Sequence, residues 1–157
     1  AFVSSTGGVN GFPGGRSIAP DEVLLVDCDI LIPAATGSVI TRENAGNIKA
    51  RLIAEAANAP TTPQGDAILN QRGIFVIPDI LCNAGGVFVS YLEYTQETQR
   101  DQMTLEEVNT RLAAQMESTF ERVHERAMQR NSSMREAAMD IAVSRVAEGI
   151  YRRGLLP

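Results

Sequence analysis

Short apolar runs in the first half of the chain predict three buried strands. They lie at residues 29–32, 51–55 and 74–77, and turn-forming residues separate them. Strands divided by helices are typical of a parallel sheet with helices on its faces. Helices are expected where capping and proline signals occur, at residues 20–26 (opened by Pro20), 41–49 (capped by Thr41) and 63–72 (capped by Thr62 and ended by Gly73).

The last third of the chain has helical periodicity and no strand signal. Thr104 with Glu107, and Ser133 with Glu136, each form the capping-box pattern that begins a helix. A further helix is expected over residues 83–100. Three-four spacing gives the last two helices apolar stripes, formed by Leu105, Val108, Leu112, Met116, Phe120, Val123 and Ala127, and by Met134, Ala137, Ala138, Ile141, Val146 and Ile150.

Residues 1–19 are rich in glycine and serine and are expected to be loop. The glycine-rich run 7–15 does not have the spacing of a dinucleotide fingerprint, and no strand precedes it. No Gly-x-Gly-x-x-Gly turn occurs elsewhere. Because three strands are only half of a doubly wound sheet, we expect an α/β fold that is a partial Rossmann-like parallel sheet followed by C-terminal helices.

Composition narrows the classes of function. With 157 residues and 44% apolar content the chain can bury a core, and its net charge of −5 argues against nucleic acid as a partner. No apolar run approaches the roughly 18 residues of a membrane span, so no membrane association is expected. Cys28 and Cys82 lack metal-ligand spacing, and free thiols are expected, as in a reducing cytoplasm.

The most informative segment is residues 78–90, which reads Pro-Asp-Ile-Leu-Cys-Asn-Ala-Gly-Gly-Val-Phe-Val-Ser. It follows a predicted strand and begins a predicted helix, with Asn83 near the helix cap and Gly85 and Gly86 in the first turn. Glycines at a helix N-terminus let a ligand approach the backbone, and α/β proteins bind ligands at the carboxyl ends of strands. Asn83 also has a purely structural interpretation as a helix cap.

This segment resembles the nicotinamide-side signature of glutamate dehydrogenases. Segment 29–35 is similar to that family's strand before the adenosine pocket. Segment 55–63 is similar to its Glu-Gly-Ala-Asn-Gly-Pro-Thr-Thr-Pro stretch, with Ala56 and Ala59 at the two glycines, and segment 142–148 resembles its final helix. The resemblance is to the C-terminal portion of the family only. It implies that residues 1–82 are the second half of an NAD(P)-binding domain, and that residues 83–157 link back to a substrate domain.

The resemblance also implies roles for two polar residues. Asn83 is expected beside the nicotinamide and the bound amino acid, where an amide can donate and accept at once. Ser90, two helical turns later, is expected on the same helix face, contacting the side-chain carboxylate of glutamate. Relatives acting on leucine, phenylalanine or valine typically lack this serine.

Other candidates follow the first two strands. Ala34, Ala35 and Thr36 are small enough to allow cofactor approach, although they would also suit a plain tight connection. Asn58 is expected to lie near the nicotinamide ribose. Alternatively, its side chain only forms the hydrogen bonds of a turn. Glu55 is either a carboxylate that orients its neighbours or simply the end of a strand.

No catalytic residue and no metal site is predicted. The family's catalytic lysine and aspartate belong to its N-terminal substrate domain, and the only lysine here, Lys49, lies outside any matching motif. His124, the only histidine, has no ligand set at metal-binding spacing and is expected to be structural or solvent-facing. The chain does not begin with methionine, which favours a fragment of a longer protein.

The resemblance therefore implies NAD(P)-dependent, reversible oxidative deamination of L-glutamate to 2-oxoglutarate and ammonia. The implied cofactor is NAD or NADP. The implied partners are the missing N-terminal part of the enzyme and further copies in a homo-oligomer. Two alternatives stay open: a dehydrogenase for another amino acid, and a non-catalytic oligomerisation or regulatory module.

Overall fold

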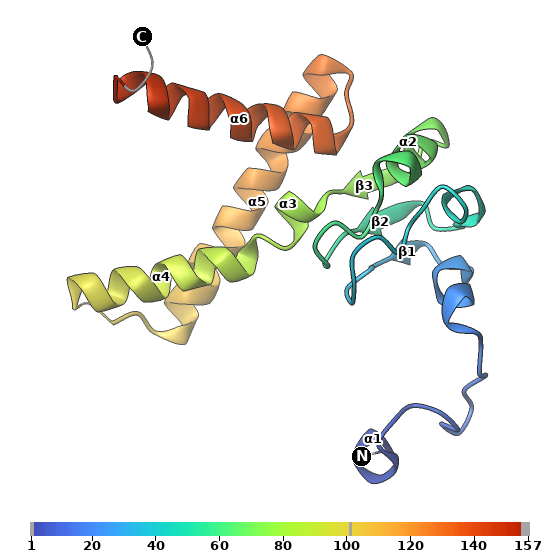
Figure 1. Ribbon diagram of the computed structural model, residues 1–157. Helices are drawn as coiled ribbons and strands as arrows, with labels where there is room; N and C mark the ends of the chain where they lie inside the picture. The colour runs from blue at the N-terminus through green and yellow to red at the C-terminus, as the bar shows by residue number, and fades with distance from the viewer. Residues whose placement is uncertain (1, 101, 155–157) are drawn as a thin grey trace.

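The computed structural model describes residues 2–100 and 102–154, and its centre is a three-stranded parallel sheet (Figure 1). The strands are β1 (Ile30–Leu31), β2 (Leu52–Ala54) and β3 (Phe75–Ile77), in the spatial order β1-β2-β3. Ile53 of β2 pairs with Leu31 on one side and Val76 on the other. The predicted α/β fold with an open parallel sheet is confirmed.

Strand β1 is the exposed edge of this sheet, so the prediction of a buried strand at residues 29–32 is wrong. Ile30 is 56% exposed and Ile32 is 58% exposed. Within the described residues β1 pairs only with β2. An apolar strand at an open parallel edge is the form expected of an interior strand whose second neighbour is absent.

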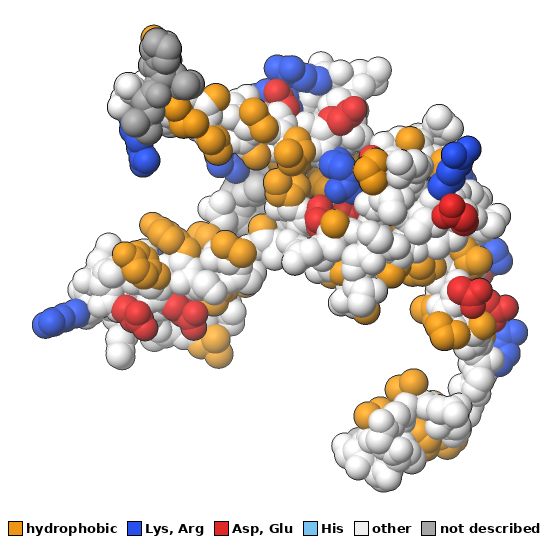
Figure 2. Space-filling model, in the orientation of Figure 1, with side chains coloured by type: hydrophobic (Ala, Val, Ile, Leu, Met, Phe, Trp, Pro, Cys, Tyr) orange, Lys and Arg blue, Asp and Glu red, His pale blue; other side chains and the backbone are white. Residues whose placement is uncertain are grey.

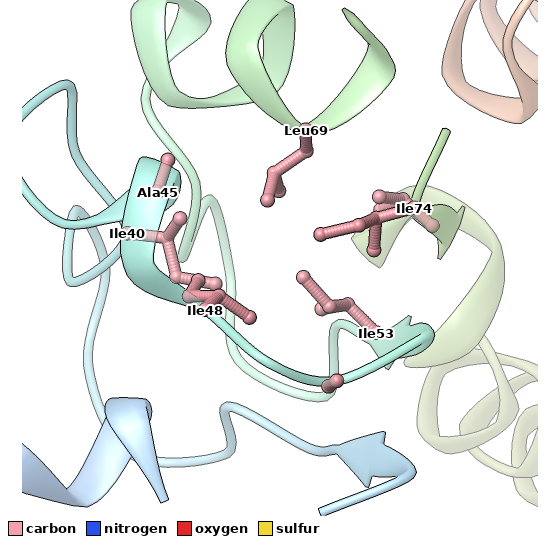
Figure 3. Close-up of a cluster of buried hydrophobic side chains, with 8 residues drawn as sticks. Ile40, Ala45, Ile48, Ile53, Leu69 and Ile74 are labelled. Carbon is pink, nitrogen blue, oxygen red and sulfur yellow. The ribbon is translucent and has the colours of Figure 1, made fainter. Parts of the chain in front are cut away.

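One hydrophobic core lies between the sheet and the elements around it (Figure 3). The short 3₁₀ helix η1 (Pro20–Leu25) supplies Leu24 and Leu25 at its margin. Helix α2 (Pro63–Gln71) begins at Thr62, whose hydroxyl accepts a hydrogen bond from the Gly65 N–H, as predicted. The buried side chains of this core are Ile40, Ala45, Ile48, Ala50, Ile53, Leu69, Ile74 and Val76.

The helix predicted over residues 41–49 is wrong, because only the 3₁₀ turn η2 (Ala45–Asn47) forms there. The Asn44 amide donates to the Val39 carbonyl and accepts from the Thr41 N–H, which fixes a local turn instead of a helical one. The Arg72 guanidinium then donates to the carbonyls of Ala45 and Ile48, both at 2.6 Å. These carbonyls are thus satisfied by the C-cap residue of α2 and not by continuation of a helix.

The helix predicted over residues 83–100 is confirmed as α4 (Gly85–Gln99), which begins two residues later than expected and is preceded by a separate short helix. The short helix, α3 (Asp79–Cys82), ends at Asn83, and α4 begins after Ala84. Asn83 is therefore the C-cap of α3, and the N-cap of α4 is Ala84, which makes no side-chain cap bond. The interpretation of Asn83 as an N-terminal helix cap is wrong, and its side chain is left for other partners.

The two capping boxes begin the two longest helices where the sequence predicts them. Helix α5 (Leu105–Arg130) begins at Thr104 and helix α6 (Met134–Arg152) at Ser133. The hairpin that they form packs on β3 and α3, and Phe75 and Ile77 lie against it. The buried side chains of this second core are Leu81, Val123, Ala127, Met134, Ala137 and Ala138.

Apolar side chains remain exposed on α4 and on the second half of α6 (Figure 2). On α4 they are Val87, Tyr91 and Tyr94, and on α6 they include Val143 and Val146. The predicted stripe of α6 is thus buried at Met134, Ala137 and Ala138 but exposed at Val146.

The N-terminal segment lies apart from the sheet in Figure 1. It contains a short helix, α1 (Phe2–Thr6), so the expectation that residues 1–19 are all loop is wrong over this turn. The Phe2 and Phe12 rings meet edge to face, with centroids 5.3 Å apart, and this contact stabilises the turn. None of the helices described is long and apolar enough to cross a membrane.

Candidate functional site

The loops that follow the three strands lie side by side along the carboxyl edge of the sheet. After β1, the Pro33 carbonyl accepts hydrogen bonds from the backbone N–H groups of Ala56 and Ala57. Further on, the Ser38 N–H donates to the Ala59 carbonyl at 2.8 Å. The loop after β1 is therefore fixed beside the loop after β2.

The structure brings together two predicted site residues, Asn58 and Asn83. The Asn83 Nδ2 group donates to the Asn58 Oδ1 atom at 2.7 Å, joining the loop after β2 to the turn after α3. Among the described residues no hydrogen bond uses the Asn83 Oδ1 atom or the Asn58 Nδ2 group. This leaves one acceptor and one donor beside each other, which suits a ligand that carries both kinds of group.

Ala34, Ala35 and Thr36 lie in the neighbouring loop, and all three are exposed. The close approach of the two loops also requires Gly37, which the sequence analysis missed. A Cβ atom there would lie 3.0 Å from the Asn58 carbonyl oxygen. Small side chains on one loop and an amide pair on the next therefore form an open, uncharged surface.

Asp79, another residue that the sequence analysis missed, holds the Asn58–Ala59 turn in place. Its Oδ2 atom accepts from the Ala59 N–H at 2.8 Å, and its own N–H donates to the Glu55 Oε2 atom at 2.9 Å. Ala59 has φ +45°, a left-handed conformation that costs energy for any residue with a Cβ atom. The turn therefore needs such outside hydrogen bonds to persist.

Arg135, at the start of α6, binds three carboxylates at once. Its Nη2, Nε and Nη1 groups lie 2.7 Å from Glu55, 3.0 Å from Asp66 and 3.2 Å from Asp79. Burial alone would lower the pKa of Arg135, but the hydrogen bonds and charges of Glu55 and Asp66 outweigh it and raise that pKa. Glu55, which is fully buried, directly follows β2 and is a partner of the Asp79 backbone and of Arg135.

Ser90 is exposed on α4, and its hydroxyl forms no hydrogen bond among the described residues. The two glycines before it differ. A Cβ atom at Gly85 would lie 3.2 Å from the Leu112 Cδ1 atom of α5, whereas none of the described atoms lies within 4 Å of such a Cβ at Gly86. Gly85 therefore permits close helix packing, and only Gly86 leaves open space for a ligand.

The Cys82 thiol, next to the turn after α3, is not activated. Burial first, and then the charges of Glu55 and Asp79, raise the pKa of the Cys82 thiol, which therefore stays protonated at neutral pH. His124 is stacked on Phe120, with ring centroids 5.9 Å apart, and has a structural role. In residues 2–100 and 102–154, no group of three or more His, Cys, Asp or Glu side chains could hold a metal ion.

A parallel sheet with small residues and amides along its carboxyl edge is typical of α/β proteins that bind nucleotide cofactors. Comparison with known proteins agrees with this class. The chain belongs to the Glutamate/Leucine/Phenylalanine/Valine dehydrogenase family, whose model matches residues 2–154. It is thus part of a family of amino-acid dehydrogenases, which are oxidoreductases.

Solved structures of this family share the fold of the chain. The hetero-hexameric glutamate dehydrogenase of Thermus thermophilus, in a leucine-bound form, has a TM-score of 0.90 and 28% identity over 99% of this chain and 36% of its own. The glutamate dehydrogenase of Peptoniphilus asaccharolyticus has 42% identity and a TM-score of 0.75 over 80% of this chain and 32% of its own. The L-tryptophan dehydrogenase of Nostoc punctiforme has 25% identity and a TM-score of 0.71 over 89% of this chain and 40% of its own. The chain therefore spans between 32% and 40% of the length of these structures.

Proposed function

We propose that this chain is the C-terminal portion of an NAD(P)-dependent glutamate dehydrogenase, which converts L-glutamate reversibly to 2-oxoglutarate and ammonia. The observation that carries the proposal is the hydrogen-bonded pair Asn58–Asn83 at the carboxyl edge of the parallel sheet. Its position beside exposed small residues suits the nicotinamide end of a dinucleotide. In this proposal residues 1–82 form half of the cofactor domain, and residues 83–157 connect it to the substrate domain.

The residues on this edge fit the proposed cofactor, NAD or NADP. The exposed backbone at Ala34, Ala35 and Thr36 allows a ligand to approach the sheet closely, because no long side chain covers it. The Asn83 Oδ1 atom can accept from the amide of a nicotinamide, and the Asn58 Nδ2 group can donate to a ribose hydroxyl. When bound, the cofactor supplies the hydride chemistry, and these residues bind and orient it.

Ser90 supports glutamate as the substrate. Its hydroxyl is exposed on α4, the helix that follows Asn83, and it can donate to a carboxylate on the substrate side chain. Solved relatives include proteins named as glutamate dehydrogenases and one named as an L-tryptophan dehydrogenase. The choice between substrate classes therefore depends on Ser90 in this proposal.

The remaining parts of the proposed enzyme would complete the sheet and the chemistry. Strand β1 has an open apolar edge that a further parallel strand can cover. The only lysine, Lys49, is exposed next to the 3₁₀ turn η2 and is not part of the Asn58–Asn83 surface. We therefore assign proton transfer to a substrate domain that precedes this chain, and expect the enzyme to be a cytoplasmic homo-oligomer.

The test is a substrate panel on the complete protein that contains this chain. The kcat/KM values for glutamate, norvaline, leucine, phenylalanine, valine and tryptophan are measured with NAD⁺ and with NADP⁺. The proposal expects the highest value for glutamate with one of the two cofactors. A higher value for a neutral amino acid would assign the chain to another dehydrogenase of the family. Absence of turnover with every substrate would favour a non-catalytic oligomerisation or regulatory module.

A further inference from the structure

Three carboxylates that are distant in sequence converge on one guanidinium at the start of α6. Glu55 follows β2, Asp66 lies in the first turn of α2, and Asp79 begins α3. Arg135 contacts all three within 3.2 Å, and its side chain is only 26% exposed. Among the described residues, Arg135 is the one cation that forms an ion pair with any of the three.

Two of these carboxylates also hold the candidate cofactor site. The Glu55 Oε2 atom accepts from the Asp79 N–H, and the Asp79 Oδ2 atom accepts from the Ala59 N–H. Ala59 directly follows Asn58, whose Oδ1 atom accepts from Asn83. In this series of contacts, hydrogen bonds therefore link Arg135 to Asp79 and Asp79 to the Ala59 N–H, and the peptide bond between Ala59 and Asn58 continues the connection to the amide pair.

Electrostatics explains why this series needs an arginine. Glu55 is fully buried, and a buried carboxylate without a counter-charge is strongly unfavourable. A guanidinium presents donors in a planar fork and can satisfy several oxygen atoms at fixed angles, whereas an ammonium acts as a single point charge. The guanidinium therefore holds the Asp79 carboxylate in one orientation and also compensates its negative charge.

We propose that Arg135 is a positioning residue for the nicotinamide end of the cofactor site, acting from α6 through Asp79 on the Asn58–Ala59 turn. This inference rests on the proposed function and extends it to a residue outside the site. Loss of the fork releases the Asp79 carboxylate, so the turn at Ala59 relaxes and Asn58 leaves its position beside Asn83. The adenosine end of the cofactor has no part in this series and should be unaffected.

The experiment uses the complete protein with Arg135→Gln, Arg135→Lys and a matched control, Arg126→Gln. Arg126 pairs with Asp140 at 2.6 Å between α5 and α6, is also partly buried, and makes no contact with the site. Two probes are titrated into each variant: NAD(P)H, followed by its fluorescence, and the adenosine-phosphate half of the same cofactor, followed by calorimetry.

We expect Arg135→Gln to weaken NAD(P)H binding about tenfold or more and to leave the adenosine half within about twofold. Arg135→Lys should fold, since it keeps the charge, and give an intermediate affinity for NAD(P)H because it lacks the fork. Arg126→Gln should bind both probes within about twofold of the wild type. If Arg135→Gln fails to fold, the Lys variant decides the question.

Three outcomes would overturn the positioning role while the proposed function stands: equal losses for both probes in Arg135→Gln, wild-type affinity for NAD(P)H in Arg135→Lys, or a similar loss in Arg126→Gln. Absence of binding by the wild-type protein would overturn the proposed function, and the positioning role with it. The two failures are therefore distinguished by the wild-type titration.

Discussion

The hydroxyl of Ser90 is the group that would separate glutamate from neutral amino acids. A hydrogen bond to a charged group contributes roughly 1.5–3 kcal/mol, so Ser90→Ala in the complete protein should lower kcat/KM for glutamate about 10- to 150-fold. Norvaline, which lacks the side-chain carboxylate, should be affected much less. Steady-state kinetics on both substrates measures the difference.

The control for this variant is Ser118→Ala, which removes an exposed serine hydroxyl from α5. This variant should have the same kcat/KM as the wild type for both glutamate and norvaline. Equal losses on glutamate and norvaline in Ser90→Ala would mean that Ser90 is structural, and the assignment of glutamate would lose its main support.

Asn83→Ala should act on all substrates alike. The substitution removes the partner of Asn58 and the free Oδ1 acceptor, and both belong to the proposed cofactor surface. Removal of a hydrogen bond costs about 1 kcal/mol, so kcat/KM should fall about fivefold or more for glutamate and norvaline together. Stability should change little through helix capping, because Asn83 does not cap α4.

Asn109→Ala, at an exposed position of α5, is the matched control for that variant. A loss confined to glutamate in Asn83→Ala would show that this amide binds the substrate side chain and not the shared part of the site.

At the scale of single residues, the sequence could predict that Asn58 and Asn83 lie together, but not the contacts of Asp79 and Arg135 that hold the Asn58–Ala59 turn in place. Asn58 and Asn83 each follow a strand signal, and parallel strands end at the same edge of a sheet. Asp79 and Arg135 lie inside segments that the sequence analysis interpreted as a motif and a capping box. Their contact joins positions 56 residues apart, and no local pattern encodes such a pairing.

Among the helices, α5 offers a test of pH dependence. The Glu107 carboxylate accepts from the N–H and the hydroxyl of Thr104, and these two hydrogen bonds, the backbone one first, lower the pKa of Glu107 from its ordinary value of 4.5. A carboxylate with a lowered pKa stabilises the helix above its ordinary pKa, and that contribution is lost as pH falls through the lowered value.

A peptide of residues 103–131 should therefore be more helical than its Glu107→Gln variant at about pH 7, and the difference should shrink as the pH falls below the ordinary pKa of Glu107. Far-UV circular dichroism of both peptides across this range measures it. Glu117→Gln, in the middle of the same helix and exposed, should show a much smaller difference at neutral pH. A difference in helicity between the parent peptide and the Glu107→Gln variant that increased at lower pH would contradict the capping role.

Elements set by neighbouring residues were predictable, and those set by distant ones were not. Both capping boxes were confirmed because each depends on residues three positions apart. The failed helix at residues 41–49 depends on Arg72, which binds the Ala45 carbonyl from 27 positions away. The short helix α3 was also missed, because Pro78 at its N-cap makes no side-chain capping bond.

For the molecule as a whole, the open edge of β1 predicts self-association of the isolated chain. An uncovered apolar edge strand pairs with other chains, so the purified chain should sediment as oligomers at concentrations on the order of tens of micromolar. Ile30→Lys should weaken this association, because a charge on an edge strand opposes pairing. Val9→Lys, at an exposed site in the N-terminal segment, should not.

A wild-type chain that sediments as a well-folded monomer would show that another segment protects the edge. Most of the length of the solved relatives lies outside this chain. In the isolated chain, self-association would therefore take the place of a contact between β1 and the rest of the complete protein.

The isolated chain should also lack glutamate dehydrogenase activity. Its site surface holds amides and small side chains, which bind and orient but do not transfer protons at neutral pH. Incubation of the purified chain with glutamate and NAD⁺ or NADP⁺ should give no NAD(P)H by absorbance. Turnover on the order of 10 per second, typical of enzymes, would contradict the assignment of proton transfer to another domain.

The sequence separation of the Arg135 contacts indicates at which stage of folding the site becomes complete. They close loops of 56 to 80 residues, whereas the strand pairs β1–β2 and β2–β3 join residues about 22 apart. Contacts between distant residues form late, because chain entropy opposes the closure of long loops. The sheet can therefore assemble while the Asn58–Ala59 turn is still unconstrained. Only the docking of α6 neutralises the three carboxylates, so cofactor affinity would report that this helix has reached its place on the sheet.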